Sequence, residues 1–555
     1  MRYVPFLAIF FVVISTTHLF GQENKELMSV SSSYALKNVN IIQSPKQKID
    51  RGTVIIKAGL ITDVGKSLTI PSDAIIIDAD SMYVYAGFID GMTHAGIAEP
   101  KKVELDKPKD PGNPSPERAG ITPQNDVVGS IHISDKTLVE LRNSGFTVAQ
   151  VVPYGNFLPG HASIIFTGGT SDEKMVLQNK SALYSELKGV PKAYPATVLG
   201  VMAKWRELYR QAAQTKNYEK LYSSNRRGLE RPIYDPTLQP FYPVIDLLLP
   251  VLIKTENIVD VSRALNLKND LQFKLIIADI KQGWPLINEI KLSGAKVFLS
   301  LDLPDEIKKK DDKTEEKDKP KQDTIAIVEK KNLESRRAES VKSYTSQAAT
   351  FEKAGISFGF SSMSAKSGEI QSNLRRMVEA GLSEETALAS LTTVPAEMLG
   401  LSDLLGTIEK GKIANLVVTK MPYFADKSEI KYVFVDGVLH KTEVKSKKCN
   451  DEKINIEGTW STVTKELKGS SYGKLIISKV DGKYLGKFNN ENSASDINLS
   501  DFEFTCDSLK YSYKVNISDA DTDIKVAVKI NGCAFSGTAN AGKLGSFTIE
   551  GKKNP

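Results

Sequence analysis

Histidine is scarce in this sequence. The 555 residues include five histidines, and no histidine lies between His161 and His440. A metal centre built on histidine needs three or more of these side chains close together, with carboxylates or cysteines completing the set. His18 lies near the N-terminus, which leaves His94, His132 and His161 for the long central part of the chain. A conventional histidine-rich centre is therefore not expected.

Cysteine is scarcer still. Cys449, Cys506 and Cys533 all lie in or near the last hundred residues, and their spacing matches no zinc-binding pattern. No cysteine is available earlier in the chain as a nucleophile. In an oxidising compartment the simplest disulfide joins Cys506 to Cys533 and leaves one thiol. Three free, buried cysteines are the alternative, and the sequence leaves both open.

The chain also lacks a charge excess and a long apolar run. A net charge of +6 is spread over the whole length without a basic stripe, so nucleic acid is not an expected partner. The one marked apolar run, "VPFLAIFFVVIS", follows Arg2 and precedes a small residue, Gly21. This pattern predicts a signal peptide over residues 1–21, with an uncleaved anchor as the alternative. We therefore expect an exported protein, periplasmic or secreted, whose mature form has no membrane span.

The rest of the sequence divides into regions of different texture. Residues 34–84 and 400–445 contain short runs rich in Val and Ile that are separated by turns, which indicates β-structure. Between them, over residues 85–399, strand-like runs such as "FTVAQVV" and "FKLIIAD" alternate with helical stretches such as "SDKTLVELRNSG". This alternation is typical of βα units around a parallel sheet or barrel. We expect the two β-flanks to pair with each other beside it.

Two further segments stand apart from this core. Residues 305–340 form a charged insertion, and its run "KKKDDKTEEKDKPKQD" over 308–323 predicts a solvated excursion, with a lid over the barrel as the alternative. Residues 455–555 contain many short alternating strands, including the hairpin signal "KLIISKVDGKYLGKF" with Asp481-Gly482 at its turn. They predict a small antiparallel β-barrel or sandwich.

Two stretches resemble the amidohydrolase superfamily, and most closely its imidazolonepropionase-like branch. The first is "IIIDADSMYVYAGFIDGMTH", over residues 75–94. The second is "GLSEETALASLTTVPAEMLGLSDLLGTIEKGKIANLVV", over residues 381–418. The resemblance implies an α/β fold, a TIM-type (β/α)8 barrel with a composite β-sandwich from both flanks. It also implies one or two divalent metals at the carboxyl ends of the barrel strands and hydrolysis of non-peptide C–N bonds in small or cyclic amides.

The resemblance fails at the positions that carry the metal. Met92 stands where the family has the first histidine of strand 1, and His94 keeps the second. The strands that should end in histidine offer Ala278 and Asp279, or Asp302. The strand that should end in aspartate offers Ser361, Ser362 or Met363. A thioether is a poor ligand for the harder divalent ions of hydrolases. The family's metal site is therefore expected to be degenerate.

His161 is the second candidate ligand. It lies in the Gly-rich segment "VVPYGNFLPGHASII", and it would either form an altered metal pair with His94 or hydrogen-bond to the backbone of its own loop. Asp279 and Asp302 are either an acid–base pair or caps of the helices that follow their strands.

We therefore expect an amidohydrolase-family protein whose metal-dependent activity is lost or much reduced, that is, a pseudoenzyme. No catalytic residue is assigned. We expect no bound cofactor, unless the ancestral site survives in part with zinc or another divalent metal. The alternative is a non-catalytic barrel that binds a small-molecule ligand or a protein partner and supports an active paralogue. The sequence leaves the oligomeric state open.

Overall fold

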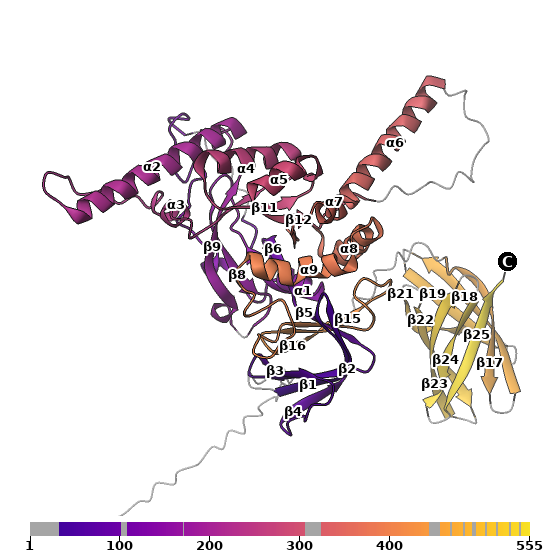
Figure 1. Cartoon of the computed structure of the whole chain (residues 1–555). Coiled ribbons are helices and arrows are strands. Elements are labelled where there is room, and N and C mark those ends of the chain that lie inside the picture. Colours follow the sequence, from indigo (N-terminus) through magenta and orange to yellow (C-terminus); the bar gives the residue numbers. More distant parts are fainter. Residues whose placement is uncertain are drawn as a thin grey trace, which may run out of the picture. The chain divides into compact units, whose positions relative to one another are not determined.

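The structure is a computed structural model of the whole chain (Figure 1). It describes residues 33–100, 108–169, 171–305, 324–442, 455–466, 469–480, 483–490, 496–505, 508–517, 520–531, 534–542 and 545–554. The chain divides into two units, Met1–Thr442 and Glu443–Pro555, which are taken separately below. The predicted signal peptide, the three cysteines and the charged run 308–323 lie outside the described residues.

The two β-flanks of the first unit form one mixed sheet of eight strands. Its hydrogen-bonded order is β16-β15-β14-β5-β1-β2-β3, with β4 paired to β1. The strands are β1 (Ser33–Ser44), β2 (Gln47–Lys57), β3 (Leu60–Gly65), β4 (Ala74–Asp78), β5 (Tyr83–Ala86), β14 (Leu416–Thr419), β15 (Ile430–Val435) and β16 (Val438–Lys441). The central pair β5–β14 joins residues more than 300 positions apart, from Tyr83↔Thr419 to Ala86↔Leu416. The flanks therefore pair as expected, and they make one continuous sheet instead of two separate layers.

The second sheet is a nearly closed barrel, with the order β13-β12-β11-β10-β9-β8-β7-β6. Its strands are β6 (Phe88–Thr93), β7 (Phe146–Val151), β8 (Gly160–Phe166), β9 (Val176–Glu186), β10 (Val251–Lys254), β11 (Leu275–Ile280), β12 (Lys296–Ser300) and β13 (Gly359–Ser361). The strand β8 is antiparallel to both β7 and β9, whereas the other paired neighbours are parallel. The prediction of a regular (β/α)8 barrel was therefore wrong in detail, because short connections on both sides of β8 replace two of the helical crossovers.

Helices follow most of the parallel strands. They are α1 (Lys136–Asn143), α2 (Val198–Ser224), α3 (Tyr242–Ile245), α4 (Ile258–Leu271), α5 (Ile287–Ser293), α6 (Thr324–Thr345), α7 (Gln347–Lys353), α8 (Ile370–Glu379), α9 (Glu384–Leu391) and α10 (Thr393–Met398). Helix α4 begins at Asn257, whose side chain accepts hydrogen bonds from the N–H groups of Val259 and Asp260, an ordinary N-cap. Among the described helices, none combines the length and the apolar character needed to cross a bilayer.

Apolar side chains fill the barrel from the inside. The interior cluster contains Met92, Val152, Ala162, Ala182, Tyr184, Leu252, Ile276, Ala278 and Phe298. A separate and larger cluster packs the outer face of the barrel against the helices, around the buried Trp205, Phe241 and Phe273. The barrel is thus a packed core, and chemistry is confined to the two ends of its strands.

The second unit is all β. Its nine described strands pair in the order β20-β19-β18-β17-β25-β24-β23-β22-β21, and every pairing is antiparallel. The strands are β17 (Gly458–Glu466), β18 (Gly469–Val480), β19 (Lys483–Asn490), β20 (Ile497–Asn498), β21 (Ser500–Thr505), β22 (Ser508–Ile517), β23 (Ala520–Asn531), β24 (Ala534–Asn540) and β25 (Ser546–Lys553). The sheet curls until β21 lies beside β19, so of the two predicted forms it is the barrel (Figure 1). The predicted hairpin is the β18–β19 pair, and Trp460 lies in the core.

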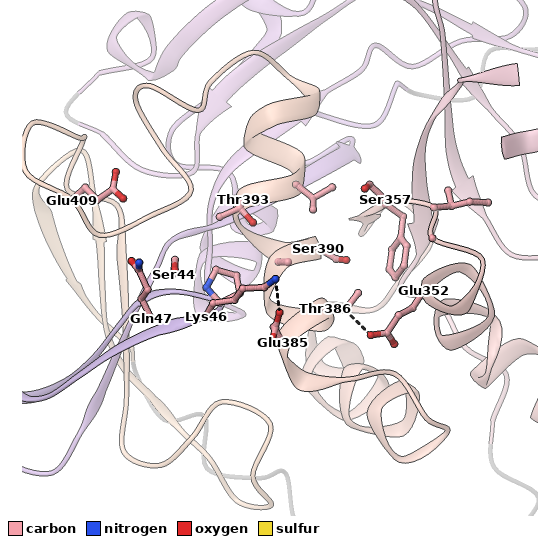
Figure 2. A pocket seen from close by; sticks show the side chains of 16 residues that line it. Ser44, Lys46, Gln47, Glu352, Ser357, Glu385, Thr386, Ser390, Thr393 and Glu409 are labelled. Carbon is pink, nitrogen blue, oxygen red and sulfur yellow. Dashed lines mark hydrogen bonds and ion pairs between the residues drawn. The ribbon is translucent and has the colours of Figure 1, made fainter. Parts of the chain in front are cut away.

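The first unit also contains a cavity of about 580 Å³ at the end of the barrel where the strands begin. It lies between the β1–β2 hairpin, the segment that leads into β13, and the helices α9 and α10 (Figure 2). In barrels of this kind the amino ends of the strands usually serve stability, and the carboxyl ends carry the chemistry.

Two glycines make room for one ring in the barrel interior, which gives a test of the packing. A Cβ atom on Gly91 would lie 2.0 Å from Phe298 Cδ1, and one on Gly359 would lie 2.5 Å from Phe298 Cε1. We expect Gly91→Ala to reduce the free energy of unfolding by about 1–3 kcal/mol, because overpacking forces the ring or the strand to shift. Urea denaturation measures this change.

Gly368→Ala is the matched control, since a Cβ atom there meets nothing within 4 Å. The second change Phe298→Leu should recover part of the loss in Gly91→Ala. A Gly91→Ala protein as stable as the unaltered one would show that the ring does not fill this space.

Candidate functional site

The carboxyl ends of the parallel barrel strands meet at one edge, which we call the barrel mouth. His94 follows β6, Glu186 ends β9, Glu256 follows β10 and Asp302 follows β12. The antiparallel β8 contributes its first residues to the same edge, because Gly160 pairs with Tyr184 near the end of β9. Active sites of barrel enzymes lie at this edge, so it is the place to look for chemistry.

The first and last barrel strands are joined by side chains. The strand β13 lies beside β6, yet the two share no backbone ladder among the described residues. Instead, the carboxylate of Asp90 accepts hydrogen bonds from the N–H of Ser362, at 3.0 Å, and from its hydroxyl. The hydroxyl of Ser361 donates to the carbonyl of Met92 at 3.0 Å. Ser361 and Ser362 therefore close the barrel at the carboxyl end of β13.

Asp90 is fully buried in this seam. Its Oδ1 also accepts a hydrogen bond from the N–H of Met92 at 3.2 Å. Burial raises the pKa of Asp90 to about 7, against the opposing effect of the hydrogen bonds from Ser362 and Met92. The group is thus a structural carboxyl that is only partly ionised at neutral pH.

Met92 lies near the end of β6, and His94 follows two residues later, directly after the strand. Met92 is fully buried in the interior cluster, where it packs with apolar side chains. His94 Nδ1 lies 2.8 Å from the carbonyl oxygen of Val152, and its ring stacks on Tyr154 at 3.8 Å. A carbonyl oxygen only accepts, so we assign the proton to Nδ1, which leaves Nε2 as the ring's acceptor. Burial lowers the pKa of His94 to about 4, so the ring is neutral.

His161 is placed differently. It lies on strand β8, not in a loop, and is almost completely buried. Its Nδ1 lies 3.3 Å from the carbonyl oxygen of Asn125, and burial lowers the pKa of His161. No interaction between His94 and His161 is found among the described residues. A metal pair formed by these two rings stays a prediction.

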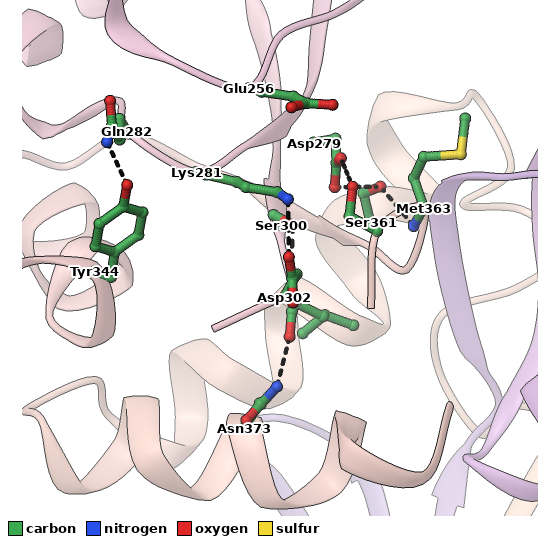
Figure 3. Close-up of polar contacts among 12 residues, drawn as sticks. Glu256, Asp279, Lys281, Gln282, Ser300, Asp302, Tyr344, Ser361, Met363 and Asn373 are labelled. Carbon is green, nitrogen blue, oxygen red and sulfur yellow. Dashed lines mark hydrogen bonds and ion pairs between the residues drawn. The ribbon is translucent and has the colours of Figure 1, made fainter. Parts of the chain in front are cut away.

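Asp279 lies at the end of β11, where the pairing with β12 contains a bulge and the aspartate has φ +60°. Bulges often redirect a side chain at the rim of a barrel. The hydroxyl of Ser364 donates to Asp279 Oδ2 at 2.5 Å, and Ser361 Oγ lies 3.5 Å from Oδ1 (Figure 3). Burial raises the pKa of Asp279, and hydrogen bonds from Ser364 and Ser300 oppose this. Asp279 does not cap α5, because that helix begins at Ile287 and its N-cap residue is Leu286, which makes no side-chain cap hydrogen bond.

Charges of both signs surround this centre. Lys281 Nζ lies 2.8 Å from Asp302, so Asp302 forms an ion pair, and its acid–base pairing with Asp279 stays a prediction (Figure 3). Lys254 Nζ lies 3.2 Å from Glu256, which is two residues beyond the end of β10. These pairs are partly exposed, so each stabilises the fold only slightly. They leave the mouth polar, with cationic and anionic groups side by side.

Sequence patterns missed part of this arrangement. Tyr184 is fully buried, and its hydroxyl donates to Glu186 at 2.7 Å. Burial, and next the charge of Glu186, raise the pKa of Tyr184. The alternation of Tyr184 and Glu186 along β9 was a usable signal, since residues two apart share a face. No local signal linked Asp90 to Ser362, because 272 positions separate them.

The donor set at the mouth does not fit the metal centre of an amidohydrolase. Within the described residues, no group of three or more His, Cys, Asp or Glu side chains is placed to hold a metal ion. Asp90 and Asp279 are engaged by serine hydroxyls, and Met92 faces apolar neighbours. Divalent ions of hydrolases require several histidine or carboxylate ligands around one point.

The buried carboxyl of Asp90 makes stability depend on pH. Its folded-state pKa is about 7, and the unfolded value is about 3.9. The folded protein therefore holds a proton that the unfolded chain releases, so the free energy of unfolding falls as pH rises from about 4 to about 7. Asp90→Asn stays neutral and keeps an acceptor for the two N–H groups. At pH 8 we expect the free energy of unfolding of Asp90→Asn to exceed that of the unaltered protein by on the order of 2 kcal/mol.

Urea denaturation at several pH values between 4 and 8 measures this difference. Asp403→Asn, at an exposed position, controls for the loss of one carboxylate. Asp279 contributes with the same sign, so some pH dependence should persist in Asp90→Asn. Parallel curves for Asp90→Asn and the unaltered protein would contradict the role given to Asp90.

Comparison with known proteins agrees with this fold. The pattern of the Amidohydrolase family matches residues 285–440. An amidohydrolase from Thermotoga maritima MSB8 is 20% identical, with a TM-score of 0.57 over 74% of this chain and 100% of that one. A putative prolidase from Bifidobacterium longum is 16% identical, with a TM-score of 0.43 over 74% and 95%. No curated protein sequence gives a significant match. Residues 285–440 thus resemble the Amidohydrolase family, and the fold of the first unit is similar to that of the Thermotoga maritima protein.

Proposed function

We propose that this protein is an exported member of the superfamily that has lost metal-dependent hydrolysis and uses its barrel mouth to bind a small polar molecule. The observation that carries the proposal is the use of the metal positions for other contacts. Met92 packs into the interior, and Ser361 and Ser362 bond to β6 to close the barrel. Export is inferred from the apolar run that follows Arg2.

Loss of activity follows from the chemistry that the superfamily uses. Its members typically rely on divalent metals. A bound metal lowers the pKa of a water molecule and supplies hydroxide for attack on a carbonyl carbon. Without such a centre, hydrolysis of an amide needs an accessible general base near the substrate. Asp90 and Asp279 are buried and hydrogen-bonded to serines, so neither carboxyl is placed to take a proton from water in contact with a substrate.

Binding is the function that the same residues support. The neutral ring of His94 leaves Nε2 as an acceptor, and the stacked ring of Tyr154 is partly exposed beside it. The pairs Lys254–Glu256 and Lys281–Asp302 supply donors and acceptors of opposite charge. Such a set suits a small ligand that carries both a cationic and an anionic or polar group. By descent, this ligand would be related to the amides that the superfamily hydrolyses.

Metal content tests the proposal directly. The mature protein, produced with zinc, iron and manganese supplied and then dialysed, should retain far less than one metal ion per chain by elemental analysis. Met92→His should change the metal content little, because the side chains of Asp279 and Ser361 remain unsuited to hold a metal. About one tightly held ion per chain, released by His94→Ala, would overturn the proposed loss of the centre.

Activity gives a second, independent test. We expect no hydrolysis of N-acetyl amino acids, dipeptides or small cyclic amides above that of an Asp279→Asn variant. Each assay would use the mature protein with and without added zinc or manganese, and product release would be followed by mass spectrometry. Turnover by the unaltered protein that disappears in Asp279→Asn would assign catalysis to this mouth.

A further inference from the structure

The cavity at the amino ends of the barrel strands carries a second binding site, independent of the mouth. It has a volume of about 580 Å³ and combines apolar and polar lining residues. Helices α9 and α10 provide one wall with Thr386, Ala389, Ser390, Thr393 and Val394 (Figure 2). Thr386 and Ser390 are four residues apart on α9, so they share one face of that helix, and α10 continues the wall after the break at Thr392.

Ser390 is the first observation that points to a ligand. Its side chain is 1% exposed, and its hydroxyl has no hydrogen-bond partner among the described residues. Buried hydroxyl groups are nearly always paired, because an unpaired one costs about 1–3 kcal/mol. An unpaired hydroxyl on a lining residue therefore indicates that a ligand in the cavity supplies its hydrogen-bond partner.

Glu352 is the second observation. Its carboxylate accepts hydrogen bonds from the N–H of Ser383 at 3.1 Å and from the hydroxyls of Ser383, at 2.5 Å, and Thr386, at 2.6 Å. Partial burial alone would raise the pKa of Glu352, but these hydrogen bonds outweigh it and the net shift is downward. The group is thus an anion. A carboxylate has about four acceptor positions, so about one remains for another donor.

The other charged lining residues already have partners. Glu385 lies 3.4 Å from Lys46, and Glu409 lies 3.3 Å from Lys412. In the described part of the chain, the hydrogen-bond partners of Glu352 are neutral donors, and no ion pair is formed, although the charge of the adjacent Lys353 also acts on it. The hydroxyl of Thr386 donates to Glu352, and Ser390 lies one helical turn further along the same face of α9. The carboxylate of Glu352, on α7, is thus held against the face of α9 that carries the unpaired hydroxyl.

We propose that this cavity binds a small organic cation with a primary ammonium group. The ammonium donates one hydrogen bond to Glu352 and a second to Ser390, which accepts it. A short alkyl chain then lies against the apolar lining residues, Pro45, Phe358 and Val394. Gln47, on the β1–β2 hairpin, would contact the exposed end of the ligand, so binding would link the composite sheet to helix α9. This site goes beyond the function proposed for the mouth and does not depend on it.

Titration calorimetry with 1,4-diaminobutane tests the proposal on the mature protein at pH 7.5 and low salt. We expect saturable binding at about one site per chain, and none for 1,4-butanediol, which has the same length without charge. Glu352→Gln should weaken binding at least tenfold, since a hydrogen bond to a charged group is lost. Glu384→Gln is the matched control: it removes one carboxylate from helix α9, which forms a wall of the cavity, at a residue outside the cavity.

A second variant separates binding from folding, because Glu352 also holds the start of α9. Ser390→Ala removes an unpaired buried hydroxyl, so the variant should fold with an unchanged or higher melting temperature. Its affinity for 1,4-diaminobutane should be lower by about threefold or more. Absence of saturable binding to the unaltered protein would overturn the proposal. So would equal weakening by Glu352→Gln and Glu384→Gln, which would reveal nonspecific attraction of a cation to a negative surface.

Discussion

The contact between Asp90 and Ser362 is the constraint on which the rest of the barrel depends. A barrel sheet normally removes its edges by pairing its first strand with its last. Here β6 and β13 are joined by the buried carboxyl of Asp90 and by the hydroxyl of Ser361, without a backbone ladder in the described structure. Phe298 packs beside this seam, against glycines of both strands. The seam thus fixes the shape of the interior as well as its closure.

The same seam shows how a barrel keeps its shape independently of the chemistry at its strand ends. Ser361 bonds to β6 and Met92 packs in the core, and the loss of metal-dependent activity proposed above rests on these contacts. A fold does not imply one reaction, because the same positions can serve packing in one protein and chemistry in another. The proposed binding rests on the polar and charged groups of the mouth.

Both ends of the barrel have features that suit the binding of a ligand. In barrel enzymes the carboxyl ends of the strands carry the chemistry, and the amino ends serve stability. In this chain the cavity at the amino ends holds an ionised Glu352 and an unpaired Ser390 hydroxyl, whereas the carboxyls at the mouth are internally satisfied. A ligand in that cavity would lie between the composite sheet and helix α9, where it would stabilise the joint between the two sheets of the unit.

The sequence by itself determined the classes of structure, because they rest on local periodicity: the β-flanks, the βα core and the C-terminal β-region. It also determined that no histidine lies between His161 and His440, since absence from the chain needs no structure to establish. Only the tertiary structure decided the antiparallel β8, the partners of Asp279 and Asp302, and the bond between Asp90 and Ser362 across 272 positions. Contacts of that kind depend on how distant strands meet, and no local pattern encodes them.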